Sequence, residues 1–203
     1  MGETGGIVVV AGMWMLWCAM HSLLIATPVV SRAKTRLGRW FAWYRLGYVL
    51  LSTITLLPLF FWTLRLPSRL LFAWDGPWWG VQGALLLYAL VMAVGGAREY
   101  DLSSFLGLRQ ITSQHRGEAQ PEFAFATKGI LRYVRHPWYS GGLALVWAAG
   151  PVTTVSLAVK LVLTGYLLLG AYLEERKLVA ALGERYRDYQ RQVPMLFPGR
   201  PWH

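Results

Sequence analysis

The sequence predicts an all-α integral membrane protein with about five transmembrane helices, the last two forming a helical hairpin, followed by a cytosolic C-terminal amphipathic helix. The 203 residues are 55% hydrophobic and only 15% charged, whereas a soluble domain carries roughly 25% charged residues. The apolar residues are gathered in long blocks, and the short loops between the blocks hold most of the basic residues. Both patterns are typical of membrane proteins.

Three apolar blocks in the first half of the chain are long enough to cross a bilayer. They run from Gly6 to Ala26, from Leu46 to Leu66 and from Trp78 to Ala97. Each approaches the roughly 20 apolar residues that a transmembrane helix needs. We therefore expect residues 1–97 to form three N-terminal spans.

The last apolar block, from Gly141 to Leu173, has 33 residues. It is too long for one crossing and too short for two full ones at about 1.5 Å per residue. Gly150 and Pro151 interrupt this block, and proline cannot continue a helix without losing a backbone hydrogen bond. We expect a hairpin of a short fourth and a longer fifth helix, with Lys160 of the fifth helix reaching out to the nearby interface.

The basic residues predict the orientation of these helices. The loop after the first span has five basic residues and no acidic one, whereas the loop after the second has only Arg65, Arg69 and Asp75. The loop after the third span and the tail from Arg176 onward are again basic. Because loops rich in Lys and Arg stay in the cytosol, we expect an outside N terminus and a cytosolic C terminus. A single kinked fourth span would place the basic tail outside, so the hairpin is preferred.

The remaining polar segments complete one domain over residues 1–203. Residues 98–135 have the composition of a cytosolic loop, and residues 136–203 hold the hairpin and the C-terminal helix. That helix is predicted from Glu174 to Val193, before Pro194. The residues near its apolar face are Leu178, Leu182, Tyr186 and Tyr189.

Several classes of function are excluded by what the chain lacks. The sequence pI is about 10.1. Because the basic residues lie in several short loops and do not form one basic face, no nucleic-acid partner is expected. The lone Cys18 and the scattered histidines have no metal-binding spacing, so no metal is expected. No glycine-rich phosphate motif follows a strand, which excludes a soluble-type methyltransferase or dehydrogenase.

Polar and aromatic groups gather where the fourth helix begins. Arg135 and His136 precede Pro137, which suits the first helical turn because its missing N–H would be unpaired there anyway. The positive end of this helix favours a carboxylate or a phosphate. Tyr139 lies within the first turn, and Gly141 would let a ligand or another backbone approach closely.

A carboxylate pair, Glu174 and Glu175, ends the fifth helix across the hairpin from Arg135. These carboxylates would accept hydrogen bonds from a ribose or an amine. Simple ion pairing with Arg135 or Arg176 is the alternative, and such a surface pair is worth only about 0–1 kcal/mol. Together the two clusters predict a ligand site at the cytosolic foot of the hairpin.

Two other places carry ionisable groups. His21 lies inside the first span, where a histidine serves as a proton relay or hydrogen-bonds a neighbouring helix. The run from Glu99 to Gln110, just past the third span, holds Asp101 and Arg109 and is either functional or an interfacial loop.

Spaced elements of the C-terminal third resemble a known superfamily. The pattern Arg-His-Pro-x-Tyr-x-Gly at 135–141, the Glu174–Glu175 pair, and Gly-Glu-x-Tyr-x-x-Tyr at 183–189 resemble the isoprenylcysteine carboxyl methyltransferase superfamily. Its members are integral membrane enzymes that use S-adenosylmethionine. His21-Ser22-Leu23 and the run containing Asp101 are similar to bacterial methanethiol S-methyltransferases and to related membrane proteins associated with nitrite and nitric oxide. Tyr100 departs from this pattern, since a histidine is expected there.

The resemblance implies a methyltransferase of a bacterial inner membrane that uses S-adenosyl-L-methionine and S-methylates a small or lipophilic thiol such as methanethiol. It implies cofactor contacts by Arg135, His136, Pro137, Tyr139, Gly141, Glu174, Glu175, Tyr186 and Tyr189. The candidates for proton removal or thiolate stabilisation are His21, Glu99, Asp101 and Arg109.

Three alternatives stay open at this point. In the first, the methyl acceptor is a carboxylate on a prenyl-like cysteine. In the second, the methyl acceptor is a phospholipid amine. In the third, the chain keeps the scaffold of these enzymes but is a non-catalytic accessory protein. The expected partners are a thiol or lipid-like acceptor and the bilayer. The sequence does not predict an oligomeric state.

Overall fold

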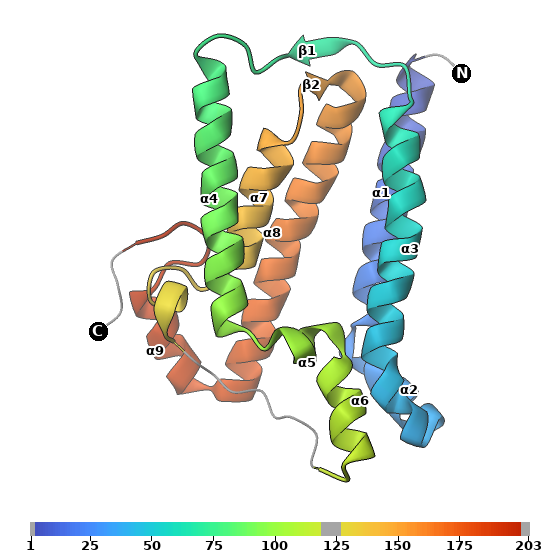
Figure 1. Ribbon diagram of the computed structural model, residues 1–203, viewed down its shortest axis with the longest axis vertical. Coiled ribbons are helices and arrows are strands. Elements are labelled where there is room, and N and C mark those ends of the chain that lie inside the picture. Colours follow the sequence, from blue (N-terminus) through green and yellow to red (C-terminus); the bar gives the residue numbers. More distant parts are fainter. Residues whose placement is uncertain (1–2, 119–126, 200–203) are drawn as a thin grey trace. The chain divides into compact units, whose positions relative to one another are not determined.

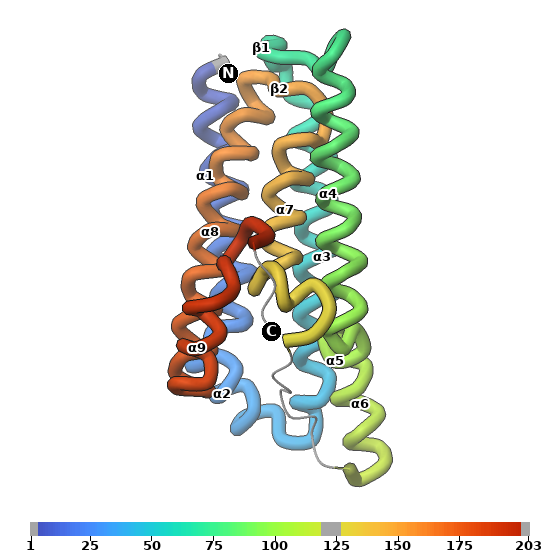
Figure 2. The backbone as a smooth tube through the Cα atoms, turned by 90° about the vertical axis from the view of Figure 1, so that its left-hand side faces the viewer, coloured from blue at the N-terminus to red at the C-terminus, as the bar shows by residue number. Residues whose placement is uncertain are grey.

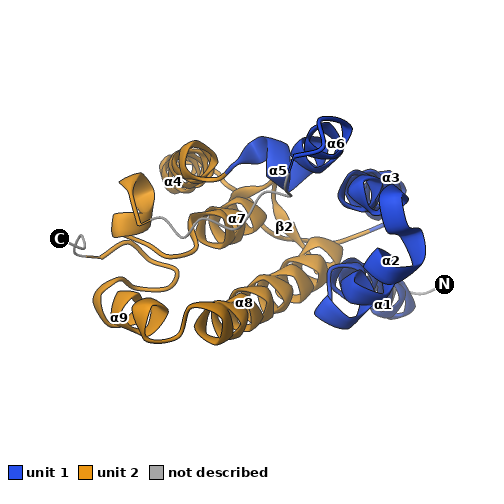
Figure 3. Ribbon diagram, turned by 90° about the horizontal axis from the view of Figure 1, so that it is seen from below, with its two compact units in different colours: residues 1–67, 101–124 blue, residues 68–100, 125–203 orange. Residues whose placement is uncertain are grey.

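The computed structural model describes residues 3–118 and 127–199, most of which are helical (Figure 1). The chain divides into two compact units (Figure 3), unit 1 with Met1–Pro67 and Asp101–Ala124 and unit 2 with Ser68–Tyr100 and Phe125–His203. The elements of unit 1 are α1 Glu3–Leu24, α2 Thr27–Leu37, the 3-10 helix η1 Gly38–Trp43, α3 Tyr44–Leu64, α5 Leu102–Leu106 and α6 Leu108–His115. Those of unit 2 are β1 Leu70–Phe72, α4 Trp78–Glu99, the 3-10 helix η2 Gly129–Arg132, α7 Pro137–Ala148, β2 Val152–Thr153, α8 Thr154–Leu182 and α9 Glu184–Gln192.

Long apolar helices confirm the integral membrane class. In the described part of the chain, four stretches are long and apolar enough to cross a bilayer: Thr4–Leu24, Thr27–Leu64, Trp78–Glu99 and Thr154–Leu182. Large side chains on these helices point outward; Leu16, Ile54 and Leu87 are 70%, 64% and 62% exposed. Apolar surface of this extent is suited to contact with lipid. The three predicted N-terminal spans agree with α1, α3 and α4 to within three residues at each end.

Two segments predicted as loops are largely helical. The basic stretch after the first span forms α2 and η1. The predicted loop 98–135 contains α5, α6 and η2, and its residues 119–126 lie outside the described residues. Polar composition indicates exposure to water and does not by itself decide the backbone conformation, so it predicts a loop even where short exposed helices form.

In unit 1, α1 and α3 lie side by side (Figure 1). The indole N–H of Trp14 donates to Thr63 Oγ1 over 3.0 Å, and that of Trp17 donates to Thr55 Oγ1 over 3.1 Å. Hydrogen bonds between apolar helices satisfy polar atoms that lipid cannot. These contacts fix the register of the two helices.

In unit 2, α7 lies between α4 and α8 (Figure 3). The contact between α7 and α4 is close because Gly141 has no side chain. A Cβ atom at Gly141 would lie 2.8 Å from the Cβ of Met92 and 3.1 Å from the backbone oxygen of Ala89. At the far end, Gln82 Nε2 donates to the backbone oxygen of Ala148 over 2.9 Å.

The break predicted at Gly150 and Pro151 is confirmed as the turn between α7 and α8. Gly150 has φ +63°, which glycine adopts without strain. β2 follows the turn and pairs antiparallel with β1. The all-α prediction missed this two-stranded sheet, because strands of two and three residues are too short to produce a periodic pattern.

The predicted role of Lys160 is wrong. The residue is 4% exposed and does not extend to an interface. Its Nζ donates to the backbone oxygens of Val146 over 2.6 Å and Ala149 over 2.9 Å. These carbonyls belong to the last turn of α7, where a cation suits the negative helix end. Lys160 therefore caps α7 from within unit 2.

The single C-terminal helix predicted from Glu174 to Val193 is also wrong. α8 continues through the carboxylate pair to Leu182, and Gly183 with φ +59° separates it from α9. α9 folds back beside α8 (Figure 2). The four residues predicted for its apolar face nevertheless pack together: Tyr186 and Tyr189 are buried, and Leu178 and Leu182 pack against them partly buried, joined by Val179 and Val193.

Candidate functional site

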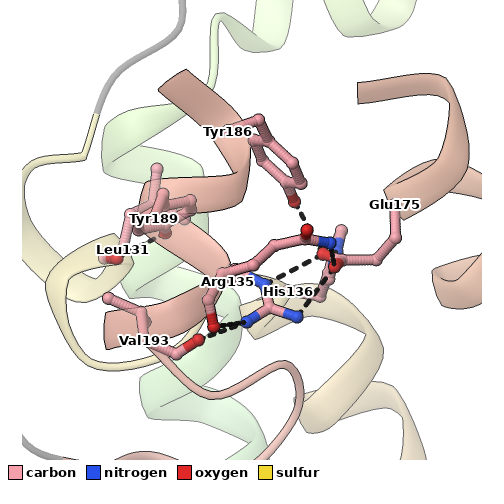
Figure 4. Close-up of polar contacts among 8 residues, drawn as sticks. Leu131, Arg135, His136, Glu175, Tyr186, Tyr189 and Val193 are labelled. Carbon is pink, nitrogen blue, oxygen red and sulfur yellow. Dashed lines mark hydrogen bonds and ion pairs between the residues drawn. The ribbon is translucent and has the colours of Figure 1, made fainter. Parts of the chain in front are cut away.

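Glu175 is the centre of a buried polar network at the foot of the hairpin (Figure 4). Its side chain is 8% exposed, as is that of Arg135. Arg135 donates to both carboxylate oxygens, from Nε to Oε1 over 3.0 Å and from Nη2 to Oε2 over 2.7 Å. His136 Nε2 lies 2.6 Å from Oε1. Because an ionised carboxylate only accepts, Nε2 carries the proton in this contact.

The last helix completes this arrangement, which we call the Glu175 network: Glu175 with Arg135, His136, Tyr186 and Gln190. Tyr186 donates its hydroxyl to Glu175 Oε1 over 2.6 Å, and Gln190 Nε2 donates to Oε2. The carboxylate thus accepts hydrogen bonds from the segment before α7 and from α9. A buried charge is tolerated when it is paired and hydrogen-bonded in this way.

Arg135 also holds the end of α9 and the chain that follows it. Its Nη1 donates to the backbone oxygens of Gln190, over 3.1 Å, and of Val193. Its backbone N–H donates to Pro194 O over 3.0 Å, and that of His136 donates to Met195 O over 3.1 Å. The segment after α9 is therefore fastened to the beginning of α7.

Local sequence explains how these groups meet. Pro137 occupies the first turn of α7, and His136 before it has the non-helical angles φ −124° and ψ 70°. Proline disfavours the helical conformation in the residue before it, so the chain turns at His136. Gly183 turns the chain at the other end and brings Tyr186 back to α8.

Tyr186 and Tyr189 attach α9 in different ways. Burial, followed by the hydrogen bond to Glu175, raises the pKa of Tyr186 above its ordinary range. Tyr189 donates its hydroxyl to the backbone oxygen of Leu131 in η2 over 2.5 Å. Burial also raises the pKa of Tyr189. Both phenols therefore stay neutral at physiological pH.

Glu174 differs sharply from its neighbour Glu175 because it is exposed. The Tyr139 hydroxyl donates a hydrogen bond to its carboxylate. Burial, and then the negative charge of Glu174, raise the pKa of Tyr100 at the end of α4. Tyr100 packs edge-to-face on Trp138, with ring centroids 4.8 Å apart. We call Glu174, Tyr139 and Tyr100 the Glu174 group.

The remaining predicted cofactor contact, Gly141, faces α4. The room left by its missing side chain is occupied by Met92 and Ala89. Its neighbour Ser140 lies 2.5 Å from the hydroxyl of Tyr88 on α4. Gly141 was predicted to allow the close approach of either a ligand or another backbone. The structure shows the approach of another backbone, that of α4.

His21 lies in a polar cluster within unit 1. Its Nε2 is 2.6 Å from the Tyr48 hydroxyl, and its Nδ1 is 3.1 Å from Ser52 Oγ, both on α3. The Trp17 ring stacks on the imidazole with centroids 5.0 Å apart. Hydrogen bonding to a neighbouring helix, one of the two roles predicted for His21, is thus observed.

Asp101 and Arg109 form an ion pair in unit 1. Asp101 caps α5 by accepting from the backbone N–H groups of Ser103 and Ser104. Hydrogen bonds, first from the Ser103 side chain and then from Arg109, hold the pKa of Asp101 well below its usual range. A carboxylate held ionised by so many donors is a weak proton acceptor at neutral pH.

Glu99 belongs to unit 2 and ends α4. Its half-buried carboxylate lies against Gly129, where a side chain would collide with it. Gly129 also has φ +52°, so the position requires glycine for two reasons.

Some residues of the site were not predicted from the sequence. Gln190 was missed, although it follows Tyr186 by one helical turn and so lies on the same face of α9. Trp138 was missed because a tryptophan at an expected membrane interface needs no further explanation. In the described ranges 3–118 and 127–199, no three His, Cys, Asp or Glu side chains gather as a metal site would require.

Several known proteins with similar sequences are named methanethiol S-methyltransferase. A methanethiol S-methyltransferase of Mycobacterium tuberculosis is 34% identical over 163 residues, which are 76% of this chain but only 63% of that protein. Methanethiol S-methyltransferase 2 of Bradyrhizobium diazoefficiens is 32% identical over 196 residues, covering 90% of this chain and 70% of the relative. The Pseudomonas deceptionensis methanethiol S-methyltransferase is 33% identical over 202 residues, covering 91% and 74%. No family model and no solved structure matches the chain.

Proposed function

Because the chain belongs to the methanethiol S-methyltransferase family, we propose that it is an integral membrane enzyme that transfers a methyl group from S-adenosylmethionine to a small thiol such as methanethiol. The observation that carries the site assignment is the contrast between two adjacent carboxylates. Glu175 is buried and accepts five hydrogen bonds from protein, whereas Glu174 is exposed beside Tyr139. The first is a structural anchor and the second is available to a ligand.

The Glu174 group fits the chemistry of S-adenosylmethionine. The cofactor has two cationic centres and a ribose diol, and each of them suits an exposed carboxylate. Tyr100, Trp138 and Tyr139 offer aromatic faces and edges, which attract a sulfonium or an adenine ring. The cofactor carboxylate is assigned to the positive end of α7, since the guanidinium of Arg135 is engaged with Glu175 and the chain after α9.

The predicted cofactor residues then divide into two roles. Glu174 and Tyr139 contact the cofactor and orient it. Arg135, His136, Glu175, Tyr186 and Tyr189 hold α9 against α8, and Pro137 and Gly141 set the position of α7. By closing the foot of the hairpin, these residues exclude water from the region where the methyl group moves.

When bound, S-adenosylmethionine supplies an electrophilic methyl group on a positively charged sulfur. The acceptor thiol must lose its proton, because the thiolate is the nucleophile. Residues that hold both partners in line accelerate such a displacement by reducing the entropy lost at the transition state. His21 and Glu99 are the proposed proton acceptors, whereas Asp101 and Arg109 are assigned to positioning because they neutralise each other.

The proposed topology keeps one domain with five spans, the short α7 and the long α8 being the fourth and fifth. The N terminus lies outside a bacterial inner membrane and α9 lies in the cytosol, which the basic loops support. Cofactor would then reach the Glu174 group from the cytosol, and a volatile apolar thiol would arrive through the bilayer.

Two measurements test this function. Titration calorimetry of purified protein in detergent should detect S-adenosylmethionine binding, and Glu174→Gln should weaken it at least tenfold while the protein stays folded. Incubation with methyl-labelled cofactor should transfer label to methanethiol but not to a prenylcysteine analogue or phosphatidylethanolamine. Binding without a labelled product from any acceptor would instead favour an accessory protein.

A further inference from the structure

A pocket of about 410 Å³ opens between α8 and α9. Its lining includes Tyr172, Arg176 and Val179 of α8, Arg187 and Gln190 of α9, and Met195. Its volume falls within the roughly 300–1,000 Å³ typical of small-molecule sites. At 100° per residue, the α8 positions of this lining point away from Glu174, so the pocket is distinct from the Glu174 group.

The charge of this pocket is positive. Arg176 and Arg187 bring two guanidinium groups from two helices, and Glu175 is the one carboxylate among the lining residues. Glu175 is already neutralised by Arg135. Within the described residues, Arg176 has no carboxylate within ion-pair distance. The pocket therefore attracts an anion.

Arg187 is free to change partners. It pairs with Glu184 one turn earlier on α9, and the two side chains are 53% and 69% exposed. An exposed pair of this kind contributes little to stability. A phosphate in the pocket would take the place of Glu184 as the partner of Arg187. The guanidinium group would then hold the phosphate through two parallel hydrogen bonds.

The surroundings of the pocket indicate an amphiphilic anion. Val179 and Met195 make part of its wall apolar. On the side toward the middle of α8, Leu168, Leu169 and Tyr172 are 42%, 55% and 54% exposed. α8 is one of the helices long and apolar enough to span a membrane, and the two arginines lie near its polar end. Basic pockets at this level of a membrane helix suit lipid headgroups.

We propose that this pocket binds the headgroup phosphate of an anionic phospholipid, with Arg176 and Arg187 on the phosphate and an acyl chain along Leu169 and Tyr172. Gln190 lines the pocket and also donates to Glu175. A bound lipid therefore secures α9 in the position that completes the Glu175 network. The inference concerns lipid binding and does not depend on methyl transfer.

The test uses the full chain in a non-ionic detergent, titrated with phosphatidylglycerol, phosphatidylcholine or inorganic phosphate while the unfolding temperature is measured. Phosphatidylglycerol should raise the unfolding temperature, and phosphatidylcholine and inorganic phosphate should not. The double variant Arg176→Gln/Arg187→Gln should weaken the apparent affinity for phosphatidylglycerol by about tenfold or more, since it removes both guanidinium groups that would hold the phosphate through charge-assisted hydrogen bonds.

A matched control removes one charge from each helix outside the pocket. Lys177 and Arg191 are exposed on α8 and α9 and do not line it, so Lys177→Gln/Arg191→Gln should bind phosphatidylglycerol as the wild type does. Ala180 also lines the pocket; Ala180→Leu keeps all charges but narrows the pocket, and it should also lose the response. An equal loss in the charge control would overturn the inference in favour of general attraction. An equal effect of inorganic phosphate would replace the lipid by a free anion and overturn it as well.

Discussion

Replacing Glu175 by glutamine tests whether this carboxylate anchors the C-terminal helix. The amide of Glu175→Gln keeps one acceptor oxygen and puts an NH2 group where the second oxygen stood. That NH2 would face donors from Arg135 and Gln190, which both contact the carboxylate now. Arg135 would remain buried, with a side chain only 8% exposed, and would have no counter-charge in this network.

The expected cost follows from these contacts. Breaking a buried ion pair by removing one partner costs about 3–5 kcal/mol, because the other charge stays desolvated and unpaired. Glu175 is a strong case, since three further groups, His136, Tyr186 and Gln190, donate to the same carboxylate. Glu174→Gln is the matched change one residue earlier. Because Glu174 is exposed, the Glu174→Gln variant should differ from the wild type in free energy of unfolding by no more than about 0.5 kcal/mol.

An unfolding experiment in mixed micelles separates the structural role of Glu175 from the ligand contact of Glu174. The loss of helix in each variant is followed by circular dichroism as the fraction of denaturing detergent increases. Glu175→Gln should unfold well before the wild type, and Glu174→Gln should unfold with it. Cofactor binding by the folded proteins should show Glu174→Gln as the weak binder. If Glu175→Gln is as stable as the wild type, or if Glu174→Gln is the less stable of the two, the assignment of anchor and ligand contact is refuted.

Two further predictions concern other buried groups. Lys160→Met should lower the free energy of unfolding by about 1–3 kcal/mol, because the carbonyls of Val146 and Ala149 lose their donor; a change below about 0.5 kcal/mol in the same unfolding assay would be expected of a lysine that reaches the interface. Burial and the hydrogen bond to Glu175 raise the pKa of Tyr186 above the ordinary value of about 10. The stability that neutral Tyr186 contributes is complete below about pH 10 and is lost as the pH rises through its higher folded-state pKa. The difference in tyrosinate absorbance between the wild type and Tyr186→Phe should therefore appear only above pH 10, and ionisation of folded Tyr186 near pH 10 would contradict this.

Much of the site was visible in the sequence as residue types at fixed spacing. Arg135, His136 and Pro137 before an apolar helix, and a carboxylate pair at its return, were enough to predict a polar cluster at one end of a hairpin. The sequence could not separate Glu174 from Glu175. Adjacent helical residues differ in direction by 100°, and which of the two faces inward depends on how α8 is rotated against its neighbours.

The sequence by itself determined the membrane class, the three N-terminal spans and the break at Gly150, because long apolar blocks and helix-breaking residues act locally. Only the tertiary structure decided that Lys160 caps α7, that Tyr186 of α9 donates to Glu175 of α8, and that Glu175 is neutralised by Arg135. The physical reason is the same in each case. A polar group beside an apolar core is stable only with a partner, and that partner comes from a distant part of the chain.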